Sequence, residues 1–427
     1  MIKNSQLRES LKSLTQIIYP YYENGLRLDD RFEDDKQYVA IMLTMLDKQI
    51  AKIPEFDLCC KIMAEDEKIQ KQLGQLVGTR SHYSLVADEK TCILGFLKQI
   101  YLESNQYDQS VFDKKYLSFE DFFYSDHLVY KDSANLYNFS FADSELALGH
   151  GVTIRRPIAR FLQQTDYEKY IERMYKPYTA FSNSMFVIER DYEAKKIIGD
   201  PGEIDQNVIF NEQHESPLLF DLVIDSLRIL KPSAIYRDHR IKSKSITFQP
   251  HGGVTERSPF YENIAVGGKC NIEANEIATL RKVFNFLCRE EDSRFLVAKR
   301  RLSSGIERRS PEDRLIDYMI GLEALYLPDG NAELSFRLSL RVAFLLSSGA
   351  MRKKTFEFLR KMYGMRSKIV HGSKYELSEE DVKKLEQLLR KSILLWIEDK
   401  SNFSVTQKTK SGRVKTKGKL DTIFFQD

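Results

Sequence analysis

The spacing of apolar residues in the last third of the chain predicts four helices joined by short connections. Apolar positions recur every three or four residues through the segments 310–326, 332–346, 352–371 and 378–398. The first begins with a Ser N-cap at Ser310, a Pro at the first helical position and acids in the first turn. Gly372 follows the third segment, and glycine is the residue that most often ends a helix. Four such helices favour an antiparallel bundle.

The rest of the chain shows two patterns of apolar residues, one typical of helices and one typical of strands. In the first hundred residues apolar side chains such as Leu7, Leu11 and Leu14 keep a helical spacing, and no alternation typical of strands interrupts them. From about residue 107, shorter segments rich in Tyr, Phe and Val predict strands. These segments are 136–141, 184–189 and 245–249. A helix is predicted over 218–230, ending before Pro232.

These patterns predict an α+β protein of several domains. A chain of 427 residues corresponds to two or three domains. We expect a mainly helical region over 1–105, a mixed α/β sensor or scaffold region over 106–290, an all-α antiparallel bundle over 291–400, and a basic, mobile tail over 401–427. Hydrophobic residues make up 42% of the chain and charged residues 30%, which excludes disorder for most of it.

The net charge of +3 hides a strongly basic segment in the tail. The segment contributes +6 and contains no acid, so the remainder of the chain carries −3. Its basic residues are Lys408, Lys410, Arg413, Lys415, Lys417 and Lys419. Because Lys alternates there with Thr, Ser and Gly, the segment cannot bury a core. It is either a solubilising extension or a set of RNA phosphate contacts, for which we single out Lys408, Lys410, Arg413 and Lys415.

Several classes of protein are excluded by what the sequence lacks. No apolar run approaches the roughly 18 residues of a bilayer span, and no signal peptide opens the chain, so we expect a cytoplasmic protein without membrane contact. The five cysteines form no C-x-x-C pair, which predicts free thiols in a reducing compartment. Since no phosphate-binding loop, zinc-protease motif or calcium loop is present, we expect neither a metal nor a cofactor.

The predicted third helix is strongly basic. The segment 351–374 contains one acid, Glu357, and eight cations: Arg352, Lys353, Lys354, Arg360, Lys361, Arg366, Lys368 and Lys374. Such a surface attracts an anionic partner, and we expect Arg360, Lys361 and Lys368 to contact RNA. Taken alone, a solvated helix face that pairs with acids elsewhere explains the pattern more simply.

Arg366 and His371 lie at the end of this helix. Five residues separate the side chains by about 140° around the helix and 7.5 Å along it, so the long Arg side chain lets both groups address one phosphate. Together they suit RNA cleavage by the neighbouring 2′-hydroxyl, in which His moves protons and guanidinium holds the developing charge. This reaction needs an acid and a base, and two chains with facing third helices would supply two His. The alternative is that His371 only caps the helix.

Three pieces of the same region, in order, resemble the HEPN superfamily, most closely its Apea-like branch. They are 313–317 with 322–325, 333–337 with 340–346, and 363–372. The resemblance covers about one fifth of the chain and implies a dimerising up-and-down bundle. It places Arg366 and His371 in the family's Arg-x4–6-His ribonuclease motif, with Ser367 where many members have Asn or Asp. Members are mostly metal-independent endoribonucleases of toxin–antitoxin, abortive-infection and other antiviral systems.

Glu323 shares a helix face with Ile316 and Ile320, where an unpaired carboxylate would be unfavourable. It should therefore find a cation or a hydrogen-bond donor. It either forms a structural ion pair or orients Arg366 or His371.

Our hypothesis is a homodimeric, metal-independent endoribonuclease, a toxin or effector in prokaryotic antiviral defence with an antitoxin or defence-system partner. In it Arg366 stabilises the phosphorane, His371 is the general acid or base, and Ser367 and Glu323 support them. The alternative is a non-catalytic HEPN module that dimerises and binds RNA or a nucleotide in the service of an N-terminal sensor.

Overall fold

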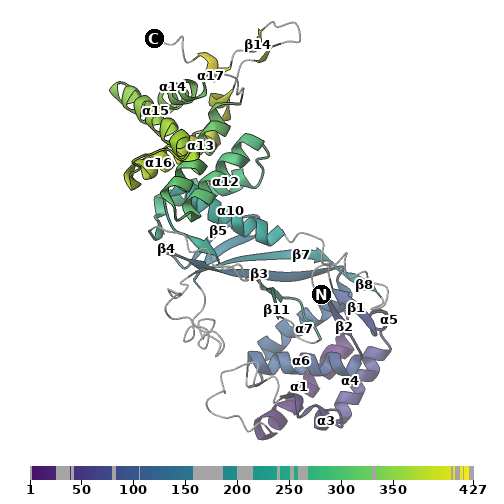
Figure 1. Ribbon diagram of the computed structural model, residues 1–427. Helices are drawn as coiled ribbons and strands as arrows, with labels where there is room; N and C mark the ends of the chain where they lie inside the picture. The colour runs from purple at the N-terminus through teal and green to yellow at the C-terminus, as the bar shows by residue number, and fades with distance from the viewer. Residues whose placement is uncertain are drawn as a thin grey trace. The chain divides into compact units, whose positions relative to one another are not determined.

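The chain is a mixed α/β protein with a helical C-terminal region, as the sequence predicts (Figure 1). The computed structural model describes residues 2–25, 39, 43–78, 83–104, 106–156, 186–199, 215–237, 241–250, 254–257, 268–328, 333–404, 407–408, 414–416 and 418–422. Its backbone contacts define two compact units: 1–133 with 190–215 and 240–258, and 134–189 with 216–239 and 259–427. Within the described ranges, no helix is both long enough and apolar enough to span a bilayer.

The first unit is built mainly from helices around an aromatic core. The helices are α1 (Ser5–Gly25), α3 (Asp47–Ile50), α4 (Pro54–Ala64), α5 (Glu67–Gln70), α6 (Glu89–Glu103) and α7 (Gln109–Tyr124). Leu7 and Leu11 of α1 are buried in the same core as Phe96 of α6 and Phe119 of α7. The helical spacing of the leucines thus faces one continuous apolar interior.

A small antiparallel sheet interrupts these helices. Strand β1 (Gln75–Gly78) pairs with β2 (Tyr83–Val86) and with β8 (Ile197–Gly199). Our expectation that no strand lies in the first hundred residues is therefore wrong. Both strands there contain only four residues, which is too short for an alternating pattern to differ from the helical spacing on either side.

The largest sheet has the strand order β11, β10, β3, β7, β6, β5, with β9 pairing on β3. Its strands are β3 (His127–Tyr137), β5 (Glu145–Gly149), β6 (Val152–Arg155), β7 (Phe186–Lys195), β9 (Tyr236–Arg237), β10 (Ile241–Ser245) and β11 (Val254–Arg257). The boundary between the units falls within β3 and β7. Outside this sheet, β4 (Phe139–Phe141) pairs in parallel with β12 (Cys270–Ile272).

The strand predictions succeed in two of three places. The predicted segment 136–141 is strand except at Asn138, whose φ of 56° breaks it between β3 and β4. The segment 184–189 falls on β7, which begins at Phe186. The prediction over 245–249 is wrong, because β10 ends at Ser245. The apolar Phe248 is buried in the aromatic core of the first unit, so its burial reflects packing and not a strand face.

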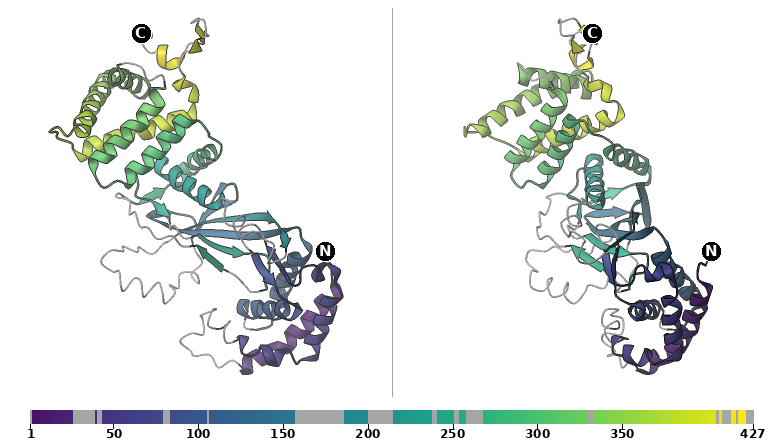
Figure 2. Two further views of the ribbon diagram at one scale, coloured as in Figure 1. Left: turned by 45° about the vertical axis from the view of Figure 1, so that its right-hand side comes forward. Right: turned by 90° about the vertical axis from the view of Figure 1, so that its right-hand side faces the viewer.

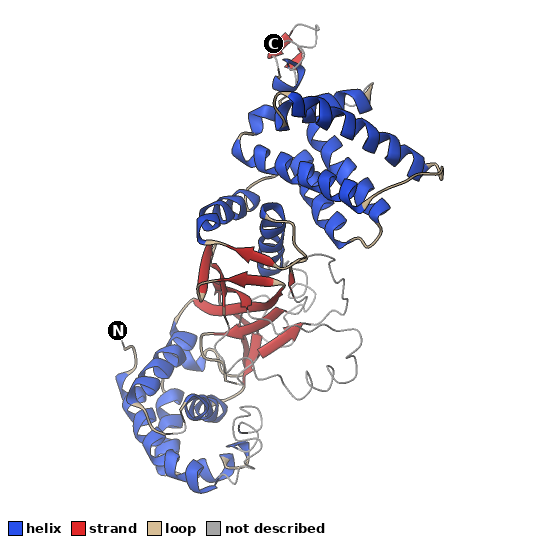
Figure 3. Ribbon diagram, turned by 90° about the vertical axis from the view of Figure 1, so that its left-hand side faces the viewer, coloured by secondary structure: helices blue, strands red, loops and turns tan. Residues whose placement is uncertain are grey.

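The second unit is helical over most of its described residues. The helices are α10 (Glu215–Leu230), α11 (Ile277–Leu287), α12 (Ser293–Glu307), α13 (Pro311–Tyr326), α14 (Leu334–Leu346), α15 (Ala350–Val370) and α16 (Glu379–Glu398). From α12 to α16 the described chain contains no strand (Figure 3). Leu322, Leu359 and Trp396 are buried in one core that α12 also joins through Phe295. The four predicted helices are confirmed, and α12 packs with them as a fifth.

Two parts of the segment that we expected to be mobile pack back onto this unit. The 3-10 helix η3 (Lys400–Phe403) buries Phe403, whose ring centroid lies 5.0 Å from that of Trp396. Helix α17 (Lys419–Thr422) lies beside η3 near the C-terminal end of the chain (Figure 2). Its Leu420 is buried. Apolar side chains that flank the basic stretch therefore pack at these two places, while the mobility of the tail stays a prediction.

The basic stretch between them contains a short pair of strands, β13 (Gln407–Lys408) and β14 (Val414–Thr416). The predicted RNA contacts Lys408 and Lys415 lie on these strands by their backbone. Lys410 and Arg413 lie outside the described residues.

Candidate active site at the end of helix α15

Helix α15 ends in a hydrogen-bonded cap that fixes the backbone around the predicted His. Gly372 has a φ of 68°, the left-handed conformation that glycine adopts without strain. Its N–H donates to the carbonyl of Ile369 at 3.1 Å, and the N–H of Ser373 donates to the carbonyl of Lys368 at 2.8 Å. These two bonds make a Schellman motif. The position of His371 at the helix terminus is therefore held by the backbone.

Arg366 is anchored on helix α13 through Glu323. Its Nη1 donates to Oε1 of Glu323 at 2.6 Å, and the two side chains are 27% and 21% exposed. The guanidinium carbon lies 5.9 Å from the ring centroid of Tyr363, one turn earlier on α15. Of the two partners considered for Glu323, the structure gives it Arg366. The carboxylate and the ring hold the guanidinium at the surface of the bundle without burying it.

Burial changes the acid–base properties of this cluster. It raises the pKa of the Glu323 carboxyl, although the Arg366 charge and a hydrogen bond from Tyr363 act in the opposite direction. Burial also raises the pKa of the Tyr363 hydroxyl, with a further contribution from the neighbouring Glu323. Tyr363 thus remains a neutral donor beside the pair, while Glu323 takes up a proton more readily than a solvated glutamate does.

His371 is exposed, and its imidazole forms no hydrogen bond or ion pair with any residue that the structure describes. Its backbone N–H donates to the carbonyl of Ser367 at 3.1 Å, so the backbone and not the imidazole completes the cap. Ser367 is exposed as well. The chain therefore brings Arg366 together with Glu323, whereas it places the His371 imidazole in solvent.

The basic face of α15 is only partly free. Nζ of Lys361 donates to Asp381 at 2.8 Å, and Lys353 lies 4.0 Å from Glu357. For these two the simpler interpretation, a helix face paired with nearby acids, agrees with the contacts. The other two predicted RNA contacts on the helix, Arg360 and Lys368, are exposed and have no acidic partner in the described part of the chain.

Tyr363 is the member of this cluster to which the sequence analysis assigned no role. It lies three residues before Arg366, so the two side chains share one face of α15. A search for aromatic side chains at that spacing from the motif Arg would have found it.

No group of three or more His, Cys, Asp or Glu side chains placed to hold a metal occurs among the described residues. All five cysteines are free thiols, as predicted.

Comparisons with protein-family models, with curated proteins and with solved structures give no match for the chain. What the site can do thus follows from its own residues. A guanidinium fixed by a carboxylate and an exposed imidazole at a helix terminus can bind an anionic phosphate and exchange protons with it.

Proposed function

We propose that the protein is a metal-independent endoribonuclease of the HEPN type, active as a homodimer. The observation that carries this proposal is the guanidinium of Arg366, fixed by Glu323 and still 27% exposed, near an exposed His371 on a rigid helix end. A partly exposed guanidinium has donors to offer a phosphate. An imidazole without a structural partner is free to take part in proton transfer.

The proposed reaction is attack of the RNA 2′-hydroxyl on the adjacent phosphorus. A base removes the 2′ proton, the bond from phosphorus to the leaving 5′ oxygen breaks, and an acid protonates that oxygen. Arg366 stabilises the negative charge that builds on the phosphoryl oxygens. Because each chain has one His371, the two copies in a dimer supply the acid and the base. The products are a 2′,3′-cyclic phosphate and a free 5′-hydroxyl.

We place this activity in prokaryotic antiviral defence, as a toxin or effector held in check by an antitoxin or another partner protein. The resemblance of 313–398 to HEPN proteins supports this setting.

The first prediction concerns His371. Purified wild-type protein in EDTA should cleave tRNA or mRNA and leave cyclic-phosphate ends, and His371→Ala should lower the rate about 10²–10⁴-fold because general acid–base transfer is lost. End mapping of the fragments measures both results. His127→Ala, which removes an exposed His of the other unit, is the matched control and should cleave like wild type. Cleavage that EDTA stops, or that survives His371→Ala, would contradict the mechanism.

A second candidate function is a binding module that positions RNA without cutting it. It is favoured by the ion pair of Arg366 with Glu323, which already satisfies part of the guanidinium, and by the lack of any described residue orienting His371. If this function is correct, wild type and His371→Ala bind RNA equally and neither produces fragments.

A further inference from the structure

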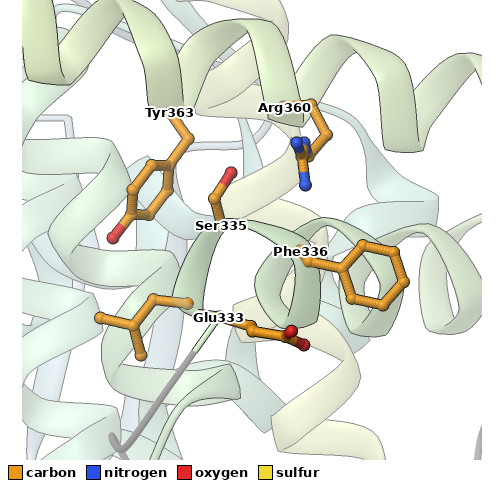
Figure 4. Close-up of a pocket in the computed structure, with 6 residues that line it drawn as sticks. Glu333, Ser335, Phe336, Arg360 and Tyr363 are labelled. Carbon is orange, nitrogen blue, oxygen red and sulfur yellow. The ribbon is translucent and has the colours of Figure 1, made fainter.

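A groove of about 620 Å³ opens between the start of α14 and the middle of α15 (Figure 4). Its lining residues are Glu333, Leu334, Ser335, Phe336, Arg360 and Tyr363. The volume falls within the roughly 300–1,000 Å³ typical of ligand sites. Tyr363 lines this groove and also lies against Arg366, so the groove adjoins the candidate active site.

Two aromatic rings border the groove. Phe336 is 37% exposed although it belongs to a helix whose other large apolar side chains are at least partly buried. Its ring centroid lies 5.6 Å from that of Phe356, at an interplanar angle of 80°, so a second ring supports it from within the protein. Tyr363 lies on the opposite side in Figure 4. Exposed, supported rings of this kind are the surfaces on which unpaired bases stack.

The groove also presents two opposite charges. Arg360 and Glu333 are exposed, and neither pairs with another residue in the described part of the chain. Both lie on the Phe336 side of the groove (Figure 4). By contrast, the neighbouring cations Lys361 and Arg366 each already pair with a carboxylate. Arg360 is therefore the groove's available phosphate ligand, while the Glu333 carboxylate repels a second phosphate and accepts hydrogen bonds from base N–H groups.

We propose that this groove binds one unpaired nucleotide of single-stranded RNA next to the scissile phosphate, with its base on Phe336 and its phosphate on Arg360. The proposal rests on the proposed function, because it makes the groove a subsite for the same substrate. It implies that the protein selects unpaired RNA, since a base inside a duplex has no face free for Phe336.

The test is a double-mutant cycle in which the Phe336 side chain and one RNA base are removed separately and together, and RNA affinity is measured. Short, fluorescently labelled single-stranded RNAs, each with a single abasic position, are titrated with full-length His371→Ala protein, which should cut them at least about 10²-fold more slowly than wild type. Stacking contributes about 1–3 kcal/mol per base, so one abasic position should weaken binding about 5–150-fold. Phe336→Ala added to this background should weaken binding of intact RNA by the same factor. It should also abolish the further effect of the abasic position.

Two matched variants separate the groove from the rest of the helix. Met351→Ala removes another exposed apolar side chain from α15 and should leave the abasic effect unchanged. Arg360→Gln should lower the slope of log affinity against log salt concentration by about one. Lys354 is an exposed cation of α15 outside the groove, and Lys354→Gln should leave the abasic effect intact. Phe336→Tyr retains the ring and should restore binding. This result would show that Phe336→Ala fails through lost stacking and not through misfolding.

The outcomes separate this proposal from the one on which it rests. If the abasic effect persists in Phe336→Ala, or if no single base matters, the subsite is wrong even where wild type cleaves RNA. If the abasic effect depends on Phe336 but wild type never cleaves, the subsite stands and the ribonuclease proposal fails.

Discussion

Individual arginines in the second unit differ in how far they are withdrawn from solvent. Arg341 is 1% exposed and bonds the carbonyl of Tyr326 at 2.6 Å and Asp421 at 2.7 Å. Arg228 is 4% exposed and pairs with Glu307. Such cations are withdrawn from solvent and pair inside the fold. Arg366 has a comparable ion pair, but its side chain remains 27% exposed. Its guanidinium is therefore available to a ligand, whereas those of Arg341 and Arg228 serve only packing.

Replacing Glu323 by Gln tests whether the carboxylate positions Arg366. The change keeps the side-chain size but removes the charge-assisted hydrogen bond, so we expect the cleavage rate kcat to fall about 10–100-fold while Tm changes little. The measurement is single-turnover cleavage across a pH series. Because the pKa of Glu323 is raised, part of the activity lost on acidification in wild type comes from its protonation, and Glu323→Gln should lack that part.

A matched control for Glu323 is a second ion pair of helix α13, the one between Arg314 and Glu379 at 2.9 Å. Glu379→Gln breaks that pair, whose Arg314 lies nine residues before Glu323 on α13, and should leave kcat unchanged. Equal losses in both variants would mean that Glu323 acts only through stability.

Lys196 gives a pH dependence in the first unit. Its Nζ donates to the carbonyl of Phe122 at 2.8 Å, near the end of α7. Burial, with a smaller effect from nearby lysines, lowers its pKa to about 8, against about 10.4 for a free lysine. Between these values the unfolded chain binds more protons than the folded one, so the free energy of unfolding should rise with pH in this window. Lys196→Met should reduce that rise, measured as the free energy of unfolding in urea titrations across the pH range. The control is Lys195→Met, which removes the exposed lysine next to it and should leave the rise unchanged.

At the scale of elements, the helices of the second unit could be predicted because local chemistry marks their ends. Ser310 and Ser378 each accept a hydrogen bond from the backbone N–H three residues later, and Gly372 closes α15. Strands β1 and β2 could not be predicted, since four residues are too few for an alternating pattern and β1 also pairs with the distant β8. In the segment 245–249, Phe248 is buried by packing in an aromatic core, which the local pattern does not distinguish from a strand face.

The candidate site likewise has a part that local sequence predicts and a part that only the packing of helices determines. Arg366, His371 and the need of Glu323 for a partner follow from spacing along single helices. The choice of Arg366 as that partner depends on how α13 packs against α15, which no local pattern contains. The groove depends likewise on α14 lying beside α15, and so Phe336 carries no signal of its own in the sequence.

Two helical glycines give a prediction about close packing. A Cβ at Gly305 in α12 would lie 2.2 Å from the buried Tyr318 ring of α13, so Gly305→Ala should lower the free energy of unfolding by about 1–3 kcal/mol through overpacking. Gly364 in α15 has no neighbour within 4 Å of that position. Gly364→Ala should raise stability by about 0.5–1 kcal/mol, because alanine favours the helix. Thermal melting of both variants checks the opposite signs, and equal shifts would contradict the packing of α12 on α13.

At the scale of the whole molecule, the proposed chemistry is incomplete in one chain. The protomer holds Arg366 through Glu323 but supplies a single imidazole at this site, with no second His beside it among the described residues. General acid–base cleavage uses two proton-transfer groups. A twofold dimer supplies both, since each residue of one chain then has a symmetric copy in the other.

Mixing chains tests this requirement. If each active site needs His371 from both chains, only wild-type homodimers cleave, and an equal mixture of exchanged wild-type and His371→Ala chains should retain about one quarter of the wild-type rate. If each chain works alone, about one half should remain. Cleavage is measured after co-refolding or slow exchange at fixed total protein, with His127→Ala as the partner chain in the control, where the full rate is expected. A residual rate of one half in a mixture that is demonstrably dimeric would mean that His371 of each chain acts without its copy, and the second proton-transfer group would then have to come from within the protomer.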